Sequence, residues 1–157
     1  MTLTVFHSSD YKKDMIQHPP FPYQPPEAEL EKASNSYLMS LIAIMVGMPM
    51  PIVNLLATGI FFMGNRRGGY FTRWHCTQAM LSQITIFLVN AGAVGWTIYI
   101  FFGAGELSNY YIAYLITAFL INLVEFIMTI YTAVKTRKGV HVEWWFWGPM
   151  THALCRK

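Results

Sequence analysis

The sequence predicts an all-α fold, an integral membrane helical bundle with three long hydrophobic regions. Hydrophobic residues make up 54% of the 157 residues and charged residues only 12%, with a mean hydropathy of +0.35. A soluble domain of this size is less apolar. Between residues 37 and 134, turn and charge signals gather at only two interruptions, 64–69 and 103–109. Each remaining segment reaches or exceeds the roughly 20 residues that cross a hydrocarbon core.

The first hydrophobic region, residues 34–63, is broken at Gly47 to Pro51, a stretch that contains Pro49 and Pro51. Proline removes a backbone donor and clashes with the preceding helical turn, so we expect a helix kink here. A kinked single span leaves the amino terminus opposite the 64–69 loop. Two half-helices in a re-entrant or tightly folded hairpin leave it on the same side. The sequence therefore predicts three or four membrane helices.

A proline-rich extramembrane arm, residues 1–33, precedes the first region. The run from His18 to Pro26 has polyproline character and cannot form a helix. Such a segment is either a flexible tail or a strap that docks along a surface at low entropic cost. Residues 28–33 are expected to form a short interfacial helix, with Ser34 or Asn35 capping the first span.

Basic residues flank the hydrophobic regions and indicate orientation. Arg66, Arg67 and Arg73 are expected to act as interfacial anchors or lipid contacts. Arg66, Arg67 and Arg73 surround the first loop, and further basic residues follow the last region, whereas residues 103–109 hold no Lys or Arg. The positive-inside rule then places the first loop and the carboxyl terminus on the cytoplasm, stroma or matrix side of a bacterial, plastid or mitochondrial inner membrane.

The second region, residues 72–102, carries a polar stripe within about 160° of one helix face. Its members are His75, Gln78, Ser82, Gln83, Thr85, Asn90 and Thr97. The stripe predicts either a helix interface joined by amide hydrogen bonds or the lining of a polar path. Ala91 and Gly95 on the same segment have small-xxx-small spacing and predict close helix packing.

The third region, residues 109–135, places Asn122 and Glu125 on one face. A carboxyl group inside hydrocarbon is costly unless it is hydrogen-bonded, neutral or near water. We expect Glu125 to face the polar stripe and to pair with Gln83 or Asn90.

The last segment, residues 140–157, is expected to be an aromatic interfacial tail, because Trp144, Trp145 and Trp147 suit the headgroup level. Cys76 and Cys155 are expected to be free thiols. The sequence contains no catalytic motif that we recognise, and we expect no enzyme, cofactor or metal site. Of the histidines, only His75 is expected within a membrane helix, with no second histidine facing it at membrane depth.

The segment from Tyr70 to Ile84 resembles the twenty-kilodalton channel-type subunit of the chloroplast inner-envelope protein translocon and its small bacterial relatives of unassigned function. Arg73, His75, Gln78, Ala79 and Gln83 occupy the places of that pattern. Residues near Glu125 and 133–139 are similar to the end of the family's last span, and Pro149 to a later proline. The resemblance implies a compact bundle with both ends on the basic side, in a multisubunit assembly linked to protein import.

Two functions follow from these observations. The first is a non-enzymatic membrane subunit related to protein translocation, whose partners are other membrane subunits, lipid and a translocating polypeptide. The alternative is an accessory structural subunit of a respiratory or other bioenergetic complex. In the first case the polar stripe contacts water and substrate, and in the second it is buried against protein. The net charge of +3 comes from residues that flank the spans, so no nucleic-acid partner is expected.

Overall fold

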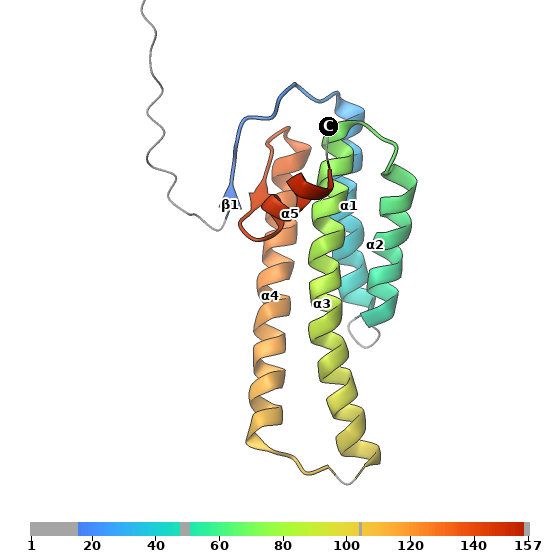
Figure 1. Cartoon of the computed structure of the whole chain (residues 1–157), viewed down its shortest axis with the longest axis vertical. Helices are drawn as coiled ribbons and strands as arrows, with labels where there is room; N and C mark the ends of the chain where they lie inside the picture. The colour runs from blue at the N-terminus through green and yellow to red at the C-terminus, as the bar shows by residue number, and fades with distance from the viewer. Residues whose placement is uncertain (1–15, 48–50, 104, 156–157) are drawn as a thin grey trace, which may run out of the picture.

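Four long helices form the body of the protein, seen in Figure 1. The computed structural model describes residues 16–47, 51–103 and 105–155. The elements follow the order β1 (Ile16–Gln17), α1 (Glu27–Gly47), α2 (Pro51–Asn65), α3 (Tyr70–Phe102), α4 (Asn109–Arg137), β2 (Glu143–Trp144) and α5 (Trp147–Leu154). The described residues thus form an all-helical protein with one short two-stranded sheet.

The first hydrophobic region is a hairpin of two helices. α1 ends at Gly47, α2 begins at Pro51, and the two helices pack against each other as well as against α3. Figure 1 shows both open ends of this hairpin at the same end of the bundle, so the chain follows the hairpin alternative and not the kinked span. Pro51 is tolerated because the first helical residue needs no intrahelical donor. Pro49 lies outside the described residues.

The short helix expected at 28–33 is not separate from the first span. α1 runs without interruption from Glu27, and the backbone N–H groups of Glu29 and Leu30 donate to the Pro26 carbonyl. Ser34 does not cap a helix, because its hydroxyl donates to the Ala133 carbonyl of α4 at 2.9 Å. The expected start of the first helix at residue 34 was therefore wrong, because Ser34 lies within α1 and its hydroxyl bonds to α4.

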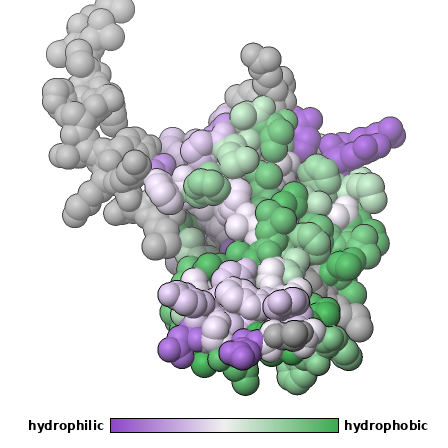
Figure 2. All heavy atoms as spheres, turned by 60° about the horizontal axis from the view of Figure 1, so that its bottom comes forward, coloured by the Kyte–Doolittle hydropathy of each residue, from purple (hydrophilic) through white to green (hydrophobic). Residues whose placement is uncertain are grey.

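Two helices are long and apolar enough to cross a membrane: α3, with 33 residues, and α4, with 29. Only 6% and 17% of their most apolar stretches are buried within the protein, unlike the core helices of a soluble domain. Figure 2 shows hydrophobic side chains over much of the visible side of the bundle. The fold is thus consistent with a helical membrane protein, and α2 contributes a shorter apolar helix.

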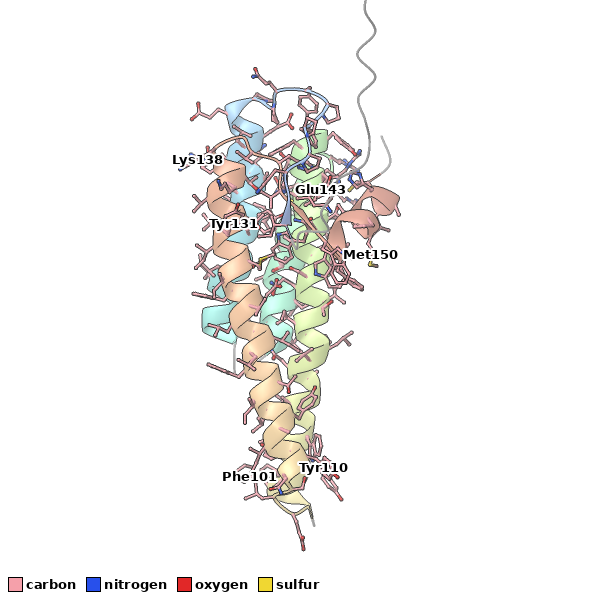
Figure 3. All side chains as sticks on the ribbon, turned by 90° about the vertical axis from the view of Figure 1, so that its left-hand side faces the viewer. Phe101, Tyr110, Tyr131, Lys138, Glu143 and Met150 are labelled. Atoms are coloured by element: carbon pink, nitrogen blue, oxygen red, sulfur yellow. The ribbon has the colours of Figure 1, made fainter. Side chains whose placement is uncertain are left out.

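One end of the bundle holds the basic residues and the other holds the α3–α4 connection. We call the first the basic end, defined by Arg66, Arg67, Arg73, Lys135, Arg137 and Lys138, and the second the far end, defined by residues 103–108. Figure 3 places Lys138 and Glu143 at the basic end and Phe101 and Tyr110 at the far end. The large side chains that are fully buried, among them Trp74, Tyr37 and Phe71, gather near the basic end.

The described part of the arm is docked, and the tail meets it. β1 pairs antiparallel with β2, with Ile16 opposite Trp144. Phe21 packs against the rings of Tyr70 and Phe71, with centroids 5.5 and 4.9 Å apart. Of the two alternatives for the arm, residues 16–26 follow the strap, although they dock on their own chain.

Candidate functional site

A buried polar network lies beneath the basic end and joins α1, α3 and the segment around β2. Gln78 Nε2 donates to the Tyr37 hydroxyl at 2.8 Å and to the Val142 carbonyl at 3.2 Å. Gln78 Oε1 accepts from the backbone N–H of Trp144 at 3.1 Å. All of these residues are buried. The Gln78 amide thus holds the tail against the two helices.

Histidines extend this network to the surface. His75 Nδ1 lies 3.0 Å from the Tyr37 hydroxyl, and His75 Nε2 lies 3.1 Å from His141 Nδ1. His141 Nε2 and His152 Nε2 lie 3.0 and 2.7 Å from Glu143 Oε1. His141 faces His75 near the basic end, because the turn after α4 folds back over the start of α3.

The ionisation of Glu143 sets the direction of the hydrogen bonds. Burial raises the pKa of this carboxyl, but hydrogen bonds and charge interactions with His141 and His152 together hold the pKa below its usual range. A carboxylate only accepts, so the Nε2 of each of these histidines carries the proton. The contacts thus run from Gln78 through Tyr37, His75 and His141 to Glu143.

A pocket of about 310 Å³ opens beside Glu143 at the end of this chain. His141 and His152 line it on one side, and the proline run of the arm lines the other. Among the described residues, no group of three or more His, Cys, Asp or Glu side chains could hold a metal ion. His75, His141 and His152 form hydrogen bonds within the fold.

The arm closes the basic end by polar as well as aromatic contacts. The Tyr23 hydroxyl donates to Glu29 at 2.7 Å and accepts from the Phe71 backbone N–H at 3.1 Å. Burial raises the pKa of Tyr23, and the hydrogen bond to Glu29 raises it further. His18 Nε2 lies 3.0 Å from the Tyr131 hydroxyl on α4. The arm thus links the starts of α1 and α3 to α4.

Halfway along the bundle, the polar stripe of α3 meets Glu125 of α4. Gln83 Nε2 donates to Glu125 Oε1 at 3.4 Å, and both side chains are buried. An open pocket of about 370 Å³ lies between α3 and α4 at this level. Its polar lining comes from Glu125, Ser82, Thr85 and Thr117. The expected partner of Glu125 is therefore adjacent to it, and part of the polar face stays open between the helices.

Further toward the far end, two asparagines join α3 and α4. Asn90 Nδ2 donates to Asn122 Oδ1 at 3.1 Å, and Asn122 Nδ2 donates to Asn90 Oδ1 at 2.7 Å. Thr97 and Tyr111 add a hydroxyl pair at 2.8 Å. Polar pairs of this kind join helices where the surroundings offer no water. Asn90 therefore bonds to a residue of its own chain.

Replacing both asparagines by leucine tests this pair. We expect a double-mutant cycle of Asn90→Leu and Asn122→Leu, in unfolding by SDS from a mild detergent, to give a coupling free energy of about 0.6–1.7 kcal/mol. The matched control is Thr117→Val, since the Thr117 hydroxyl donates only to Ala113 within α4. Additive effects of the two leucine changes would show that the pair does not couple the helices.

Some of the residues predicted to pack helices or to anchor the protein make contacts within the fold, and others are exposed. Among the described residues, nothing lies near the position that a side chain at Gly95 would take, so Gly95 makes no close approach there, and Ala91 is half-buried. Arg66 and Arg67 are exposed, whereas the Arg73 guanidinium lies 5.7 Å from the Tyr70 ring centroid. Cys76 and Cys155 are free and buried, which confirms the thiol prediction.

Trp144 is a correction to the expected interfacial tail. Its indole is 5% exposed and donates to the Thr132 hydroxyl at 2.7 Å. Trp147 packs against the same core, and only Trp145 of the three tryptophans is exposed. Pairing of β2 with β1 turns alternate side chains inward, which buries Trp144.

The structure is that of a helical protein in which two helices, α3 and α4, are long and apolar enough to cross a membrane. The described parts of both terminal segments close its basic end. The chain belongs to the magnetosome magnetite crystal formation protein family (MamF_MmsF), whose sequence profile matches residues 33–151. This range contains most of α1, all of α2, α3 and α4, and the buried network of Tyr37, His75 and Gln78. No curated protein and no solved structure matched the chain.

The family corrects the resemblance drawn from Arg73, His75, Gln78, Ala79 and Gln83. The chain does not belong to the chloroplast translocon family, and neither translocation nor a bioenergetic role has support. The motif has a structural explanation: His75 and Gln78 are fully buried and bonded to α1 and to the tail. Residues that satisfy a buried helix junction do not by themselves indicate a polypeptide path.

Proposed function

We propose that this chain is a non-enzymatic protein of the magnetosome membrane that takes part in forming magnetite crystals. The observation that carries the proposal is the family match over residues 33–151, which includes nearly all of the apolar helical body. The buried network supports a structural role, since His75 and Gln78 bond to other parts of the chain and are closed to substrate. In this proposal the protein has a structural role in the membrane and performs no catalysis.

The orientation that we propose places the basic end in the cytoplasm and the far end in the magnetosome lumen. No Lys or Arg occurs between Trp74 and Val134, so the far end lacks positive charge. Its connection instead carries the exposed carboxylate Glu106. The segment that faces the mineral is therefore small and is limited to residues 103–108 and the adjoining helix ends.

A cellular experiment tests the proposed function. In a magnetite-forming bacterium that lacks its own copy of this protein, the full chain is expected to restore crystal size and number in electron micrographs. A fluorescent fusion is expected to follow the magnetosomes. Unaltered crystals in the strain without the protein, or a fusion spread evenly over the cell membrane, would contradict the proposal.

Labelling from one side of the membrane tests the orientation. In sealed vesicles with the cytoplasmic face outside, a membrane-impermeant maleimide is expected to label Arg66→Cys but not Glu106→Cys until detergent is added. The native Cys76 and Cys155 are buried and give the background. Labelling of Glu106→Cys in intact vesicles would reverse the assignment.

We also propose that the protein works beside other membrane proteins. The pocket beside Glu125 is open between α3 and α4 and is lined mainly by apolar side chains, a surface suited to packing of a partner helix. Gentle detergent extraction followed by a native gel is expected to show co-migrating magnetosome membrane proteins. Migration as a single chain under these conditions would sink this part of the proposal.

A further inference from the structure

The hairpin of α1 and α2 reaches only part of the way along α3. A side chain at Gly59 of α2 would contact Met80 of α3 at 3.7 Å, so these residues lie at one level. From Gly59 back to Pro51, α2 descends about 12 Å, to the level of Leu88. α3 continues from there to Phe102, about 21 Å further.

Contacts between α1 and α4 independently give a similar depth for the end of the hairpin. Ser34 bonds to Ala133, and α1 descends from Ser34 to Gly47 by about 20 Å, to the level of Leu120. α4 begins at Asn109, about 16 Å beyond that level. Figure 1 shows α1 and α2 ending well short of the far end. Beyond that level, the described structure contains only the rest of α3 and α4 and the connection between them.

The exposed side chains on both halves are apolar. Near the far end they include Ile98, Phe101, Ile112, Ile116 and Phe119, each roughly half exposed or more. On the hairpin, Leu38, Ile42, Ile52, Leu56 and Ile60 are similarly exposed. Both the two-helix half and the four-helix half therefore present surfaces suited to lipid chains.

α5 widens the basic end further. Phe146, Met150 and Leu154 are exposed around this short helix, beside the exposed Trp145. Figure 3 shows Met150 projecting away from the bundle at the level of the helix. An apolar helix face beside aromatic residues is typical of a segment that lies in the headgroup region.

We propose that the protein is a wedge that prefers membranes whose convex face carries its basic end. The partner is the lipid bilayer itself. The half at the basic end contains two more helices than the far half, an excess of roughly 200 Å² in cross-section from the helix diameter. A leaflet that is convex offers its components more room at the surface than the opposite leaflet, so the wide half fits there. The inference rests on the helices crossing the bilayer and does not depend on a role in crystal formation.

A membrane tether pulled from a giant vesicle of phosphatidylethanolamine and phosphatidylglycerol tests the wedge with the unaltered, fluorescently labelled full chain. With the basic end outward, the ratio of protein density in the tether to that in the flat membrane is expected to exceed one. With the basic end inward, the ratio is expected to fall below one. Protease treatment from outside reports the orientation in each preparation.

The two orientations control for each other. Simple exclusion from a narrow tether lowers the density ratio in both orientations, whereas the wedge raises it in one and lowers it in the other. A ratio of one in both orientations overturns the proposal, and so does a ratio that lies above one in both or below one in both. The variant Met150→Ser with Leu154→Ser removes apolar contacts of α5 only. It is expected to reduce the outward ratio while leaving it above one, since the α1–α2 hairpin remains. Because no mineral is present, this test and the cellular test fail independently.

Discussion

Replacing Phe71 by alanine is expected to destabilise the protein by about 3–5 kcal/mol, the usual cost of removing a fully buried aromatic ring. Phe71 is 0% exposed and contacts the rings of Phe21, His75 and His141. The loss therefore affects the junction of the arm, α3 and the tail together. The free energy of unfolding, measured by SDS titration from a mild detergent, gives the size of the effect.

Phe101→Ala is the matched control, since Phe101 has the same side chain on the same helix and is 78% exposed. Its effect on unfolding is expected to stay within about 0.5 kcal/mol. Limited proteolysis adds a second readout: Phe71→Ala should speed cleavage within residues 16–26, because the ring on which Phe21 rests is gone. Equal stabilities of the two variants would show that the basic end is not the folding core.

Replacing Gln78 by alanine is expected to cost about 3–5 kcal/mol, because its amide serves three buried groups. The change leaves the Val142 carbonyl and the Trp144 backbone N–H without their partner and removes a donor to Tyr37. Each buried polar group left unpaired costs about 1–3 kcal/mol. Tryptophan fluorescence should report the loss of stability, since the backbone N–H of the buried Trp144 bonds to the Gln78 amide.

Gln24→Ala provides the comparison for this variant. Gln24 lies in the arm at the same end of the molecule and is exposed, so its loss is expected to change stability by less than about 0.5 kcal/mol. A Gln78→Ala protein that unfolds like the Gln24→Ala protein would mean that water replaces the amide. That outcome would assign the network to an open, hydrated site.

Much of the fold could be predicted, because hydrophobic length and turn residues are local signals. The second and third regions, expected at 72–102 and 109–135, became α3 and α4 within a few residues. The stripe with Gln83 and Asn90 follows directly from helical periodicity. The hairpin at Pro51 was left open, since proline shows that a helix is interrupted but not whether the chain continues or reverses.

The network at the basic end could not be found from sequence. Tyr37 is separated from His141 and Glu143 by more than a hundred residues, and the three residues have no common periodicity. The only local signal was a His75 and Gln78 pair on one helix face. Trp144 and Trp145 are neighbours with opposite surroundings, because Trp144 ends β2 and is buried whereas Trp145 lies in the turn that follows and is exposed. Composition suggested an interfacial anchor for both residues and gave no sign of this boundary.

The strand pair at Ile16 and Trp144 orders the events of biosynthesis. The two residues are near opposite ends of the chain, so the arm has no strand to join until β2 has left the ribosome. The apolar helices emerge before that moment and can enter the bilayer first. Residues 21–26 can pack on α1 and α3 before then, through Phe21 and Tyr23, so pairing of β1 is the last step and follows insertion. A nascent chain stalled before residue 143 should therefore keep residues 16–18 accessible to protease, and release of the full chain should protect them.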